Sequence, residues 1–325
     1  MRFDLSGFAR GGREHSHAEL LSLCEEAERL DFHGIWFNEF HFQTPVQAYP
    51  SIPILAASIL ARTTRLRVGA SAVVTPLRHP LLLAEEIAQL HWQSGGRFDL
   101  GMGRGTHPDT LSALGLDVEA TRERFETAFD VLRQAWTQGV AKPGDAGASA
   151  PLLPTGETVP VYVAGTSRDT LLFAARHNLP LLLSLDPPEG GQLEACAAIE
   201  AEHGLATAHP ETSLCRYVCI APTRAQADEK LDRLLPMFHA RRVAAARAAG
   251  RDTSKLFQPD RRSSLETQFL AGSPDDCVRQ VRRISEETSF TSMRLVFNGN
   301  GVIGWDEALS DMRLFALTVL PAFDI

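Results

Sequence analysis

The sequence predicts an α/β fold, specifically a TIM-type (β/α)8 barrel with insertion segments at its C-terminal mouth. Short apolar runs typical of strands alternate with helix-periodic segments, and this alternation repeats eight times. The 325 residues can form one such barrel, so residues 1–325 are interpreted as a single domain. Glycine and polar residues gather just after the strand-like runs, where a barrel carries its site.

Eight strands are predicted because each run is short, apolar and followed by a helical pattern. They cover residues 2–7, 34–37, 66–74, 98–102, 159–163, 179–184, 214–220 and 293–297. The predicted helices cover residues 18–30, 52–62, 81–92, 119–138, 168–177, 192–203, 224–249, 274–287 and 306–320. Strands that are each separated by a helix run parallel, which favours the closed barrel.

Two segments interrupt the alternation. Residues 142–156 are rich in Gly, Pro and Ala and are expected to form a surface excursion. Residues 251–264 are polar and show no periodicity. The second segment is either a mobile loop over the barrel mouth or an insertion without function.

Composition argues against several functional classes. The net charge of −8 without a basic run argues against nucleic acid as a partner. No apolar stretch reaches 18 residues and the first residues lack the apolar segment of a signal peptide, so a cytoplasmic protein without membrane spans is expected. The five cysteines are scattered without metal-ligand spacing, which predicts core thiols and no metal site.

The stretch Ser94–Gly105 is the most informative motif. It predicts a turn, a strand and then Arg104 between Gly103 and Gly105. Glycine lets the backbone turn and approach a ligand, and the guanidinium presents a planar donor fork to phosphate or carboxylate. Arg104 is therefore a candidate phosphate ligand, with a structural ion pair as the alternative.

A dinucleotide-binding fingerprint is the rival interpretation of these glycines. It requires glycine at position 106, where this sequence has Thr106. About thirteen residues of loop are also expected between the glycines and the next helix, which in a Rossmann unit opens directly on them. Both observations argue against a dinucleotide site.

Other strand ends supply further candidates for cofactor binding. Gly165, Thr166 and Ser167 precede a predicted helix, where hydroxyls and amides form an anion site or simply cap the helix. Small residues at 69–72 suggest that a flat group packs against the backbone of the third strand. Ser184 ends the sixth strand, and Arg122 begins a predicted helix as either a ligand or a solvated side chain.

With these motifs assembled, the chain resembles the bacterial luciferase-like flavin monooxygenase family nearly end to end. The resemblance rests on five segments in order: Gly34–Phe42, Val68–Val74 with His79-Pro80, Ser94–Gly105, Pro160–Thr170, and the closing segments around Gly272–Pro274 and Met312–Pro321. It implies the same α/β barrel and a reduced flavin, usually FMN, at the barrel mouth.

The resemblance also implies roles for particular residues. Arg104 and Arg122 would contact the flavin phosphate or its surroundings, and Thr166 and Ser167 would donate to it. Ser71-Ala72 matches the position of a non-prolyl cis peptide beneath the flavin ring. The full set of expected cofactor-binding residues is Ser71, Ala72, Arg104, Arg122, Gly165, Thr166, Ser167 and Ser184.

Two departures from the family pattern concern catalysis. The pattern Glu-His-His-Phe is here Glu39-Phe40-His41-Phe42, so Phe40 replaces the histidine tied to catalysis in light-emitting members. Gly103 stands where a reactive cysteine is expected. Light emission is therefore not expected. His41, whose side chain should face away from that of Phe40, and His107 are the candidate catalytic residues, with a core histidine as the alternative for His41.

The resemblance implies a two-component, FMN-dependent monooxygenase acting with dioxygen on an apolar small organic substrate. A separate flavin reductase would supply reduced FMN, because the chain has no nicotinamide-binding motif of its own. The alternatives are an F420-dependent oxidoreductase and a non-catalytic flavin-binding or partner subunit. A homodimer through the helices at 52–60 and 81–92 is also implied.

Overall fold

The computed structural model describes most of the chain. The described residues are 1–9, 15–42, 46–105, 107–142, 150–151, 159–185, 189–205, 209–248, 253 and 261–323. The predicted excursions at 142–156 and 251–264 therefore lie largely outside the described residues.

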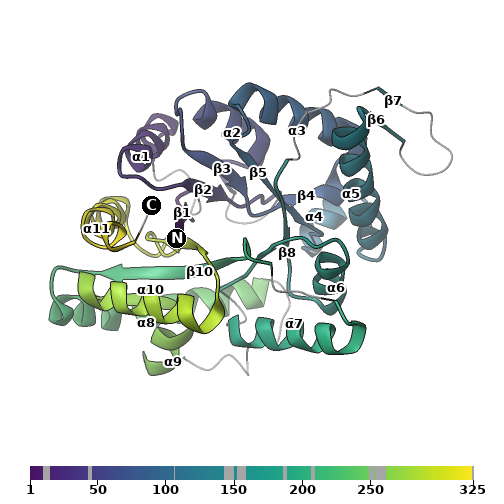
Figure 1. The fold of residues 1–325 in the computed structure, drawn as a ribbon. Helices are drawn as coiled ribbons and strands as arrows, with labels where there is room; N and C mark the ends of the chain where they lie inside the picture. The colour runs from purple at the N-terminus through teal and green to yellow at the C-terminus, as the bar shows by residue number, and fades with distance from the viewer. Residues whose placement is uncertain are drawn as a thin grey trace.

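Eight parallel strand positions close into a barrel, as predicted (Figure 1). The order around the barrel is β1 (Arg2–Ser6), β2 (Gly34–Phe37), β3 (Arg67–Ala70) continued by β4 (Val73–Val74), β5 (Phe98–Gly103), β8 (Val161–Ala164), β9 (Leu181–Leu182), β10 (Ser213–Ile220) and β12 (Ser292–Val296). β12 pairs with β1 through Arg2 opposite Ser292, and this pairing closes the ring.

Helices surround the barrel (Figure 1). They are α1 (His17–Arg29), α2 (Ile52–Leu60), α3 (Pro80–Ser94), α5 (Ala120–Gln138), α6 (Arg168–Arg176), α7 (Glu189–His203), α8 (Arg224–Ala248), α10 (Pro274–Thr288) and α11 (Trp305–Thr318), with short 3₁₀ turns at Thr75–Leu77 and Leu320–Ala322. Each begins and ends within a few residues of the prediction. Capping explains two of the starts, because Ser16 and Ser273 form capping boxes with Glu19 and Asp276.

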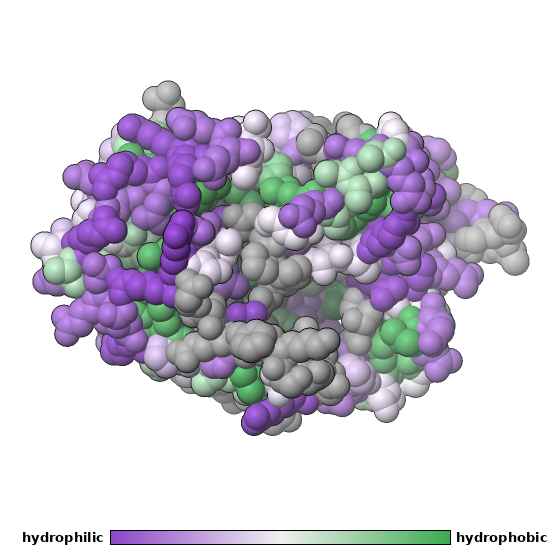
Figure 2. Space-filling view, turned by 90° about the horizontal axis from the view of Figure 1, so that it is seen from below, coloured by the Kyte–Doolittle hydropathy of each residue, from purple (hydrophilic) through white to green (hydrophobic). Residues whose placement is uncertain are grey.

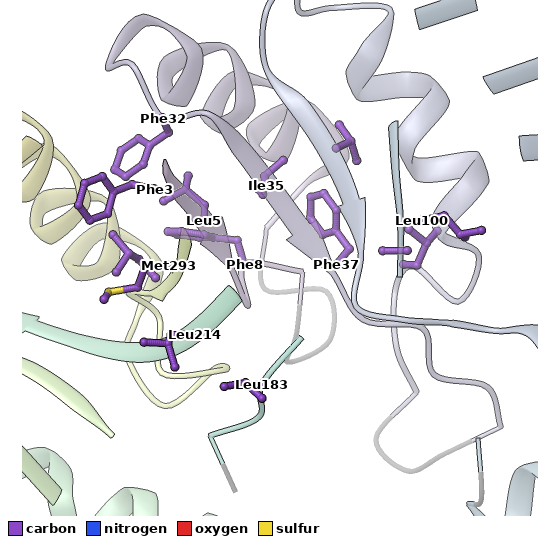
Figure 3. Packing of buried hydrophobic residues seen from close by; sticks show 14 of the residues in the cluster. Phe3, Leu5, Phe8, Phe32, Ile35, Phe37, Leu100, Leu183, Leu214 and Met293 are labelled. Atoms are coloured by element: carbon purple, nitrogen blue, oxygen red, sulfur yellow. The ribbon is translucent and has the colours of Figure 1, made fainter. Parts of the chain in front are cut away.

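Along each barrel strand, side chains point alternately outward, toward the helices, and inward, toward the barrel axis. The outward side chains are apolar and many of the inward ones are polar. Phe3 and Leu5 of β1, Ile35 and Phe37 of β2, and Met293 of β12 belong to the buried hydrophobic cluster that Figure 3 shows close up. The intervening residues face the barrel axis, as the two-residue period of a strand requires. The hydrophobic effect therefore fixes the helices to the outside of the strands, and the interior is free for polar chemistry.

Ion pairs fill the amino-terminal part of the interior. Arg2 donates to Asp4 at 2.9 Å and to Asp99 at 2.7 Å, and Arg67 donates to Asp99 at 2.5 Å. The indole Nε1 of Trp36 donates to Asp4 Oδ2, the oxygen that also accepts from Arg2, at 2.7 Å. Arg2, Asp4, Arg67 and Asp99 therefore each have a partner of opposite sign, and Asp99 joins Arg2 of β1 to Arg67 of β3.

The flat group that packs on the third strand is a side chain of the protein itself. An added Cβ at Gly69 would lie 2.3 Å from the ring of Trp36, so only glycine leaves room for the indole. Gly69 thus accommodates Trp36, and Ser71 and Ala72 remain to line the cavity described below.

Five short elements were not predicted. β11 (Phe269–Gly272) pairs with the end of β10, and β6 (Val140–Ala141) pairs with β7 (Ala150–Pro151) as a two-stranded ribbon. α4 (Pro108–Ala113) occupies the segment expected to be loop, and α9 (Arg261–Thr267) begins inside the segment expected to lack structure. Proline at the first helical position explains the start of α4.

Replacing Gly69 with alanine should destabilise the fold by about 1–3 kcal/mol, because the new methyl group would overlap the indole of Trp36. The matched control is Gly190→Ala in α7, where an added Cβ would meet nothing within 4 Å and the free energy of unfolding should change by less than about 1 kcal/mol. Chemical denaturation measures both changes. Equal effects at the two positions would contradict the packing described here.

Candidate functional site

A cavity of about 790 Å³ opens at the carboxyl ends of the strands. The space-filling view from below shows a hollow near the centre of one face, surrounded by a largely hydrophilic periphery (Figure 2). Eight of the ten predicted site residues line the cavity: His41, Ser71, Ala72, Arg104, His107, Gly165, Thr166 and Ser184. The cavity has the size of pockets that hold cofactors and small ligands.

The floor of the cavity contains a cis peptide bond between Ser71 and Ala72, as predicted. The backbone amide of Ser71 donates to Phe37 O at 2.7 Å, and the side-chain amide of Asn38 donates to Ser71 O at 2.5 Å. The Ser71 hydroxyl accepts a hydrogen bond from Arg294 Nη1 at 2.9 Å. Backbone and side chain of Ser71 are therefore fixed from β2 and β12 together.

Arg104 follows β5 on the cavity wall. Within the described part of the chain, no carboxylate lies within ion-pair distance of Arg104, so the alternative of a structural ion pair is not observed there. Gly105 has a left-handed backbone, with φ of +63°, and an added Cβ would lie 2.1 Å from Val74 Cγ1. Glycine at 105 is thus required for the backbone turn that follows Arg104.

Thr166 borders the cavity, whereas Ser167 and Arg122 are not among the residues that line it. Ser167 caps α6, and its hydroxyl lies 2.8 Å from Thr170 Oγ1. Arg122 Nη2 donates to the same Thr170 oxygen at 3.2 Å, while its Nε and Nη1 are buried without an acceptor among the described residues. A guanidinium and two hydroxyls therefore meet at the start of α6, just behind the wall.

Thr170 is a polar residue of this cluster that the sequence analysis missed. It lies three residues after Ser167, on the first turn of α6, and is 4 % exposed. A second hydroxyl one turn into a helix that begins with Thr166-Ser167 is the signal that could have identified it.

Glu39 is a buried carboxylate beside the cavity mouth. His41 Nε2 lies 2.6 Å from Glu39 Oε1, and Arg78 Nη2 donates to the same oxygen at 3.1 Å. Both Phe40 and His41 border the cavity. The segment after Phe37 is not a strand, and strict alternation does not apply to it.

His107 is the second candidate imidazole. It precedes α4 and borders the cavity, and its Nδ1 is buried without a hydrogen-bond partner among the described residues. The neighbouring Thr110 hydroxyl donates to the carbonyl oxygen of His41 at 2.7 Å, which ties the two loops together. Two imidazoles are thus present on one side of the cavity.

The opposite side of the cavity carries polar residues that the sequence analysis did not identify. The Asn300 amide donates to the Tyr217 hydroxyl at 3.3 Å, and Asn298 donates to Gly7 O at 2.8 Å. Arg241 of α8 donates to Gly299 O at 3.3 Å, and burial lowers the pKa of its guanidinium. Cys215 also borders the cavity, so this thiol is not confined to the hydrophobic core.

Comparison with known proteins identifies the family. A family model described as luciferase-like monooxygenase matches residues 1–292. The chain belongs to this family. The match confirms the resemblance and the enzyme class that it implies, a flavin-dependent monooxygenase.

Individual relatives are similar over nearly their whole length. The alkanal monooxygenase alpha chain of Photorhabdus luminescens is 25 % identical over 93 % of this chain and 90 % of its own. The 4-hydroxyprotoasukamycin monooxygenase of Streptomyces nodosus subsp. asukaensis is 28 % identical over 94 % of this chain and 86 % of its own.

Solved structures share the fold at low sequence identity. The oxygenating constituent of 3,6-diketocamphane monooxygenase from Pseudomonas putida, solved with FMN, has a TM-score of 0.76 at 17 % identity and covers 100 % of this chain and 99 % of its own. The coenzyme F420-dependent tetrahydromethanopterin reductase of Methanopyrus kandleri has a TM-score of 0.70 at 17 % identity and covers 99 % of each chain.

The walls of the cavity in this luciferase-like monooxygenase are apolar between the polar residues. Phe40, Val74, Leu77, Leu111 and Leu185 all border it. Among the described helices, none is long and apolar enough to cross a membrane. No cluster of three metal-ligating side chains occurs within the described ranges.

Glu39→Gln should lower the free energy of unfolding by about 1–3 kcal/mol, because it removes the buried counter-charge of Arg78. Glu86→Gln is the matched control, since Glu86 approaches the same Arg78 at 3.7 Å with a half-exposed side chain and should contribute less than about 0.5 kcal/mol. Denaturant titration at neutral pH compares the two variants. A larger loss in the Glu86 variant would show that the buried pair does not stabilise the cavity mouth.

Proposed function

We propose that this protein is a two-component monooxygenase that takes reduced FMN from a separate flavin reductase. With dioxygen it would oxidise an apolar small organic substrate. The observation that carries the proposal is the position of Arg104. It is a cation without a described carboxylate partner, on the cavity wall near the Ser71-Ala72 peptide and the start of α6.

The phosphate of the flavin would bind between Arg104 and the first residues of α6. Thr166 borders the cavity there, and the amino-terminal end of a helix attracts an anion. Arg122, Ser167 and Thr170 lie directly behind this position and are held together by hydrogen bonds. A small rotation of their side chains would bring them into contact with the phosphate. Without it, they would instead hold the neighbouring Thr166 in position to bind the phosphate.

The flavin ring would lie on the surface made by Ser71, Ala72 and Gly103. An added Cβ at Gly103 would come 3.1 Å from Ala72 Cβ, so glycine keeps this surface flat and open. The bound flavin supplies the redox chemistry, and the protein orients it and limits access of water. Gly165 and Ser184, on neighbouring strand ends, border the same space.

Proton transfer would fall to His41 or His107. The carboxylate of Glu39 orients the His41 imidazole, whose Nε2 lies 2.6 Å from Glu39 Oε1. His107 has an unpartnered ring nitrogen on the cavity side of α4. With Phe40 and Gly103 in place of the histidine and cysteine of the family pattern, the protein is not expected to emit light.

Arg104→Ala should weaken binding of FMN by about 10-fold or more, because a charge-assisted hydrogen bond to phosphate is lost. Binding of riboflavin, which lacks the phosphate, should not change. Arg124→Ala removes an exposed arginine of α5 that does not border the cavity and should leave both affinities unchanged. Fluorescence titration with oxidised and, under anaerobic conditions, reduced flavin measures these affinities.

The same titration separates the alternative functions. Tight binding of F420 but not FMN would favour an F420-dependent oxidoreductase, a cofactor named for the Methanopyrus kandleri neighbour. Binding of reduced FMN without oxygen-dependent turnover of any apolar substrate would favour a non-catalytic subunit. Unchanged FMN affinity in the Arg104 variant would overturn the phosphate site.

We also propose a homodimer through α2 and α3. Ile54 of α2 is 72 % exposed, and Leu82 and Trp92 of α3 are 59 % and 72 % exposed. Such side chains on adjoining helices favour contact with a second apolar surface. Trp92→Glu should convert the protein to a monomer in light scattering, whereas Leu317→Glu, at a 68 % exposed position of α11, should not. A wild-type protein that is monomeric at all concentrations would refute the dimer.

A further inference from the structure

Arg294 of β12 is a buried cation with only neutral partners. It is 4 % exposed and borders the cavity floor. Its guanidinium donates to Ser71 Oγ at 2.9 Å, to Leu183 O at 2.6 Å, and to the hydroxyl and carbonyl oxygens of Ser213 at 3.3 Å each. In the part of the chain that the structure describes, no carboxylate pairs with it, whereas the interior Arg2 and Arg67 both pair with Asp99.

Burying the positive charge of Arg294 costs free energy when no negative charge lies nearby. An arginine stays protonated in proteins, and a buried charge is normally balanced by an ion of opposite sign. Burial lowers the pKa of the Arg294 guanidinium, because it disfavours the charged form. A ligand that brings negative charge to the cavity floor would recover part of that free energy.

Arg294 also retains a hydrogen-bond donor. Of its five N–H groups, Nη1 carries two, and only one of them has an acceptor among the described residues, the Ser71 hydroxyl. Ser71 is half of the cis peptide that the flavin ring would cover. The remaining N–H therefore belongs to the nitrogen whose other N–H donates to Ser71 Oγ at 2.9 Å.

The two cavity arginines can be assigned different tasks. Arg104 would bind the phosphate, whose charge is the same in oxidised and reduced FMN, so Arg104 cannot distinguish the two states. The ring itself differs, because reduced flavin loses a proton near neutral pH and becomes an anion, whereas the oxidised ring is neutral. A cation at the ring can distinguish them.

We propose that Arg294 makes the cavity select reduced, anionic flavin over oxidised flavin. This inference rests on the flavin site proposed above and assigns the choice of redox state to one residue. It also accounts for exchange with a reductase, since flavin that has been oxidised loses the charge that Arg294 favours and is bound less tightly.

The test compares oxidised and reduced riboflavin, which isolate the charge of the ring from that of the phosphate. Wild-type protein should bind reduced riboflavin about 10–100-fold more tightly than oxidised riboflavin in anaerobic titrations. Its preference should fall as the pH is lowered through the pKa of the reduced ring. Arg294→Met should bind the two forms within about 3-fold of each other and show no such pH profile, while affinity for oxidised riboflavin stays near the wild-type value.

Arg294→Lys keeps the positive charge and is the matched variant, because it should retain the preference for reduced riboflavin. If the Met variant does not fold, the Lys variant alone tests whether the charge at position 294 causes the preference for reduced riboflavin. A Lys variant that binds oxidised riboflavin normally but has no preference would overturn the inference, as would a Met variant that keeps the wild-type preference.

The remaining outcomes separate this inference from the proposed function. Wild-type protein that binds both forms of riboflavin equally, but needs Arg104 for FMN, overturns the role of Arg294 and leaves the flavin site intact. Wild-type protein that binds neither FMN nor riboflavin in either redox state overturns both proposals.

Discussion

One buried guanidinium, that of Arg294 in β12, ties β9 and β10 to the cavity floor. β9 is only two residues long and shares a single paired position with β10, Leu182 opposite Ser213. Arg294 Nη2 donates to Leu183 O at the end of β9 and to Ser213 O of β10, and so adds to the backbone hydrogen bond from Leu183 N to Ser213 O at 3.0 Å. The same side chain reaches Ser71 beyond β3. It therefore holds the shortest strand and the cavity floor in one arrangement.

The side chain of Trp36 packs beneath the cavity floor and sets the position of that floor in the barrel. Trp36 occupies the barrel interior between the ion pairs of Arg2 and Asp4 and the guanidinium of Arg294, whose carbon lies 6.0 Å from the indole centroid. The space for the indole exists because residue 69 is glycine. Trp36 thus separates the ion pairs around Arg2 and Asp4 from Arg294, which has no carboxylate partner among the described residues. The cavity begins above Arg294.

Local sequence patterns were sufficient to predict the barrel, because each strand and helix leaves its own periodicity in the chain. Arg104 was identifiable for a similar reason, since its flanking glycines are adjacent in sequence. Arg294 carried no such signal. It lies between Met293 and Leu295 in an apparently ordinary strand, and its main partner Ser71 is 223 positions away in the chain. Only closure of the barrel brings these residues together.

The segment after β2 shows why the candidate catalytic residues were harder to place than the fold. The alternation that holds from Gly34 to Phe37 ends where the strand ends, and Phe42 adopts a left-handed backbone with φ of 55°. His41 and Phe40 both border the cavity. The family pattern has an imidazole at the position of Phe40, and this chain retains one at the next residue, with Glu39 and Arg78 fixing the charge around it. The chain therefore keeps the second of the two imidazoles of the family pattern, at the cavity mouth, and has an apolar ring in place of the first.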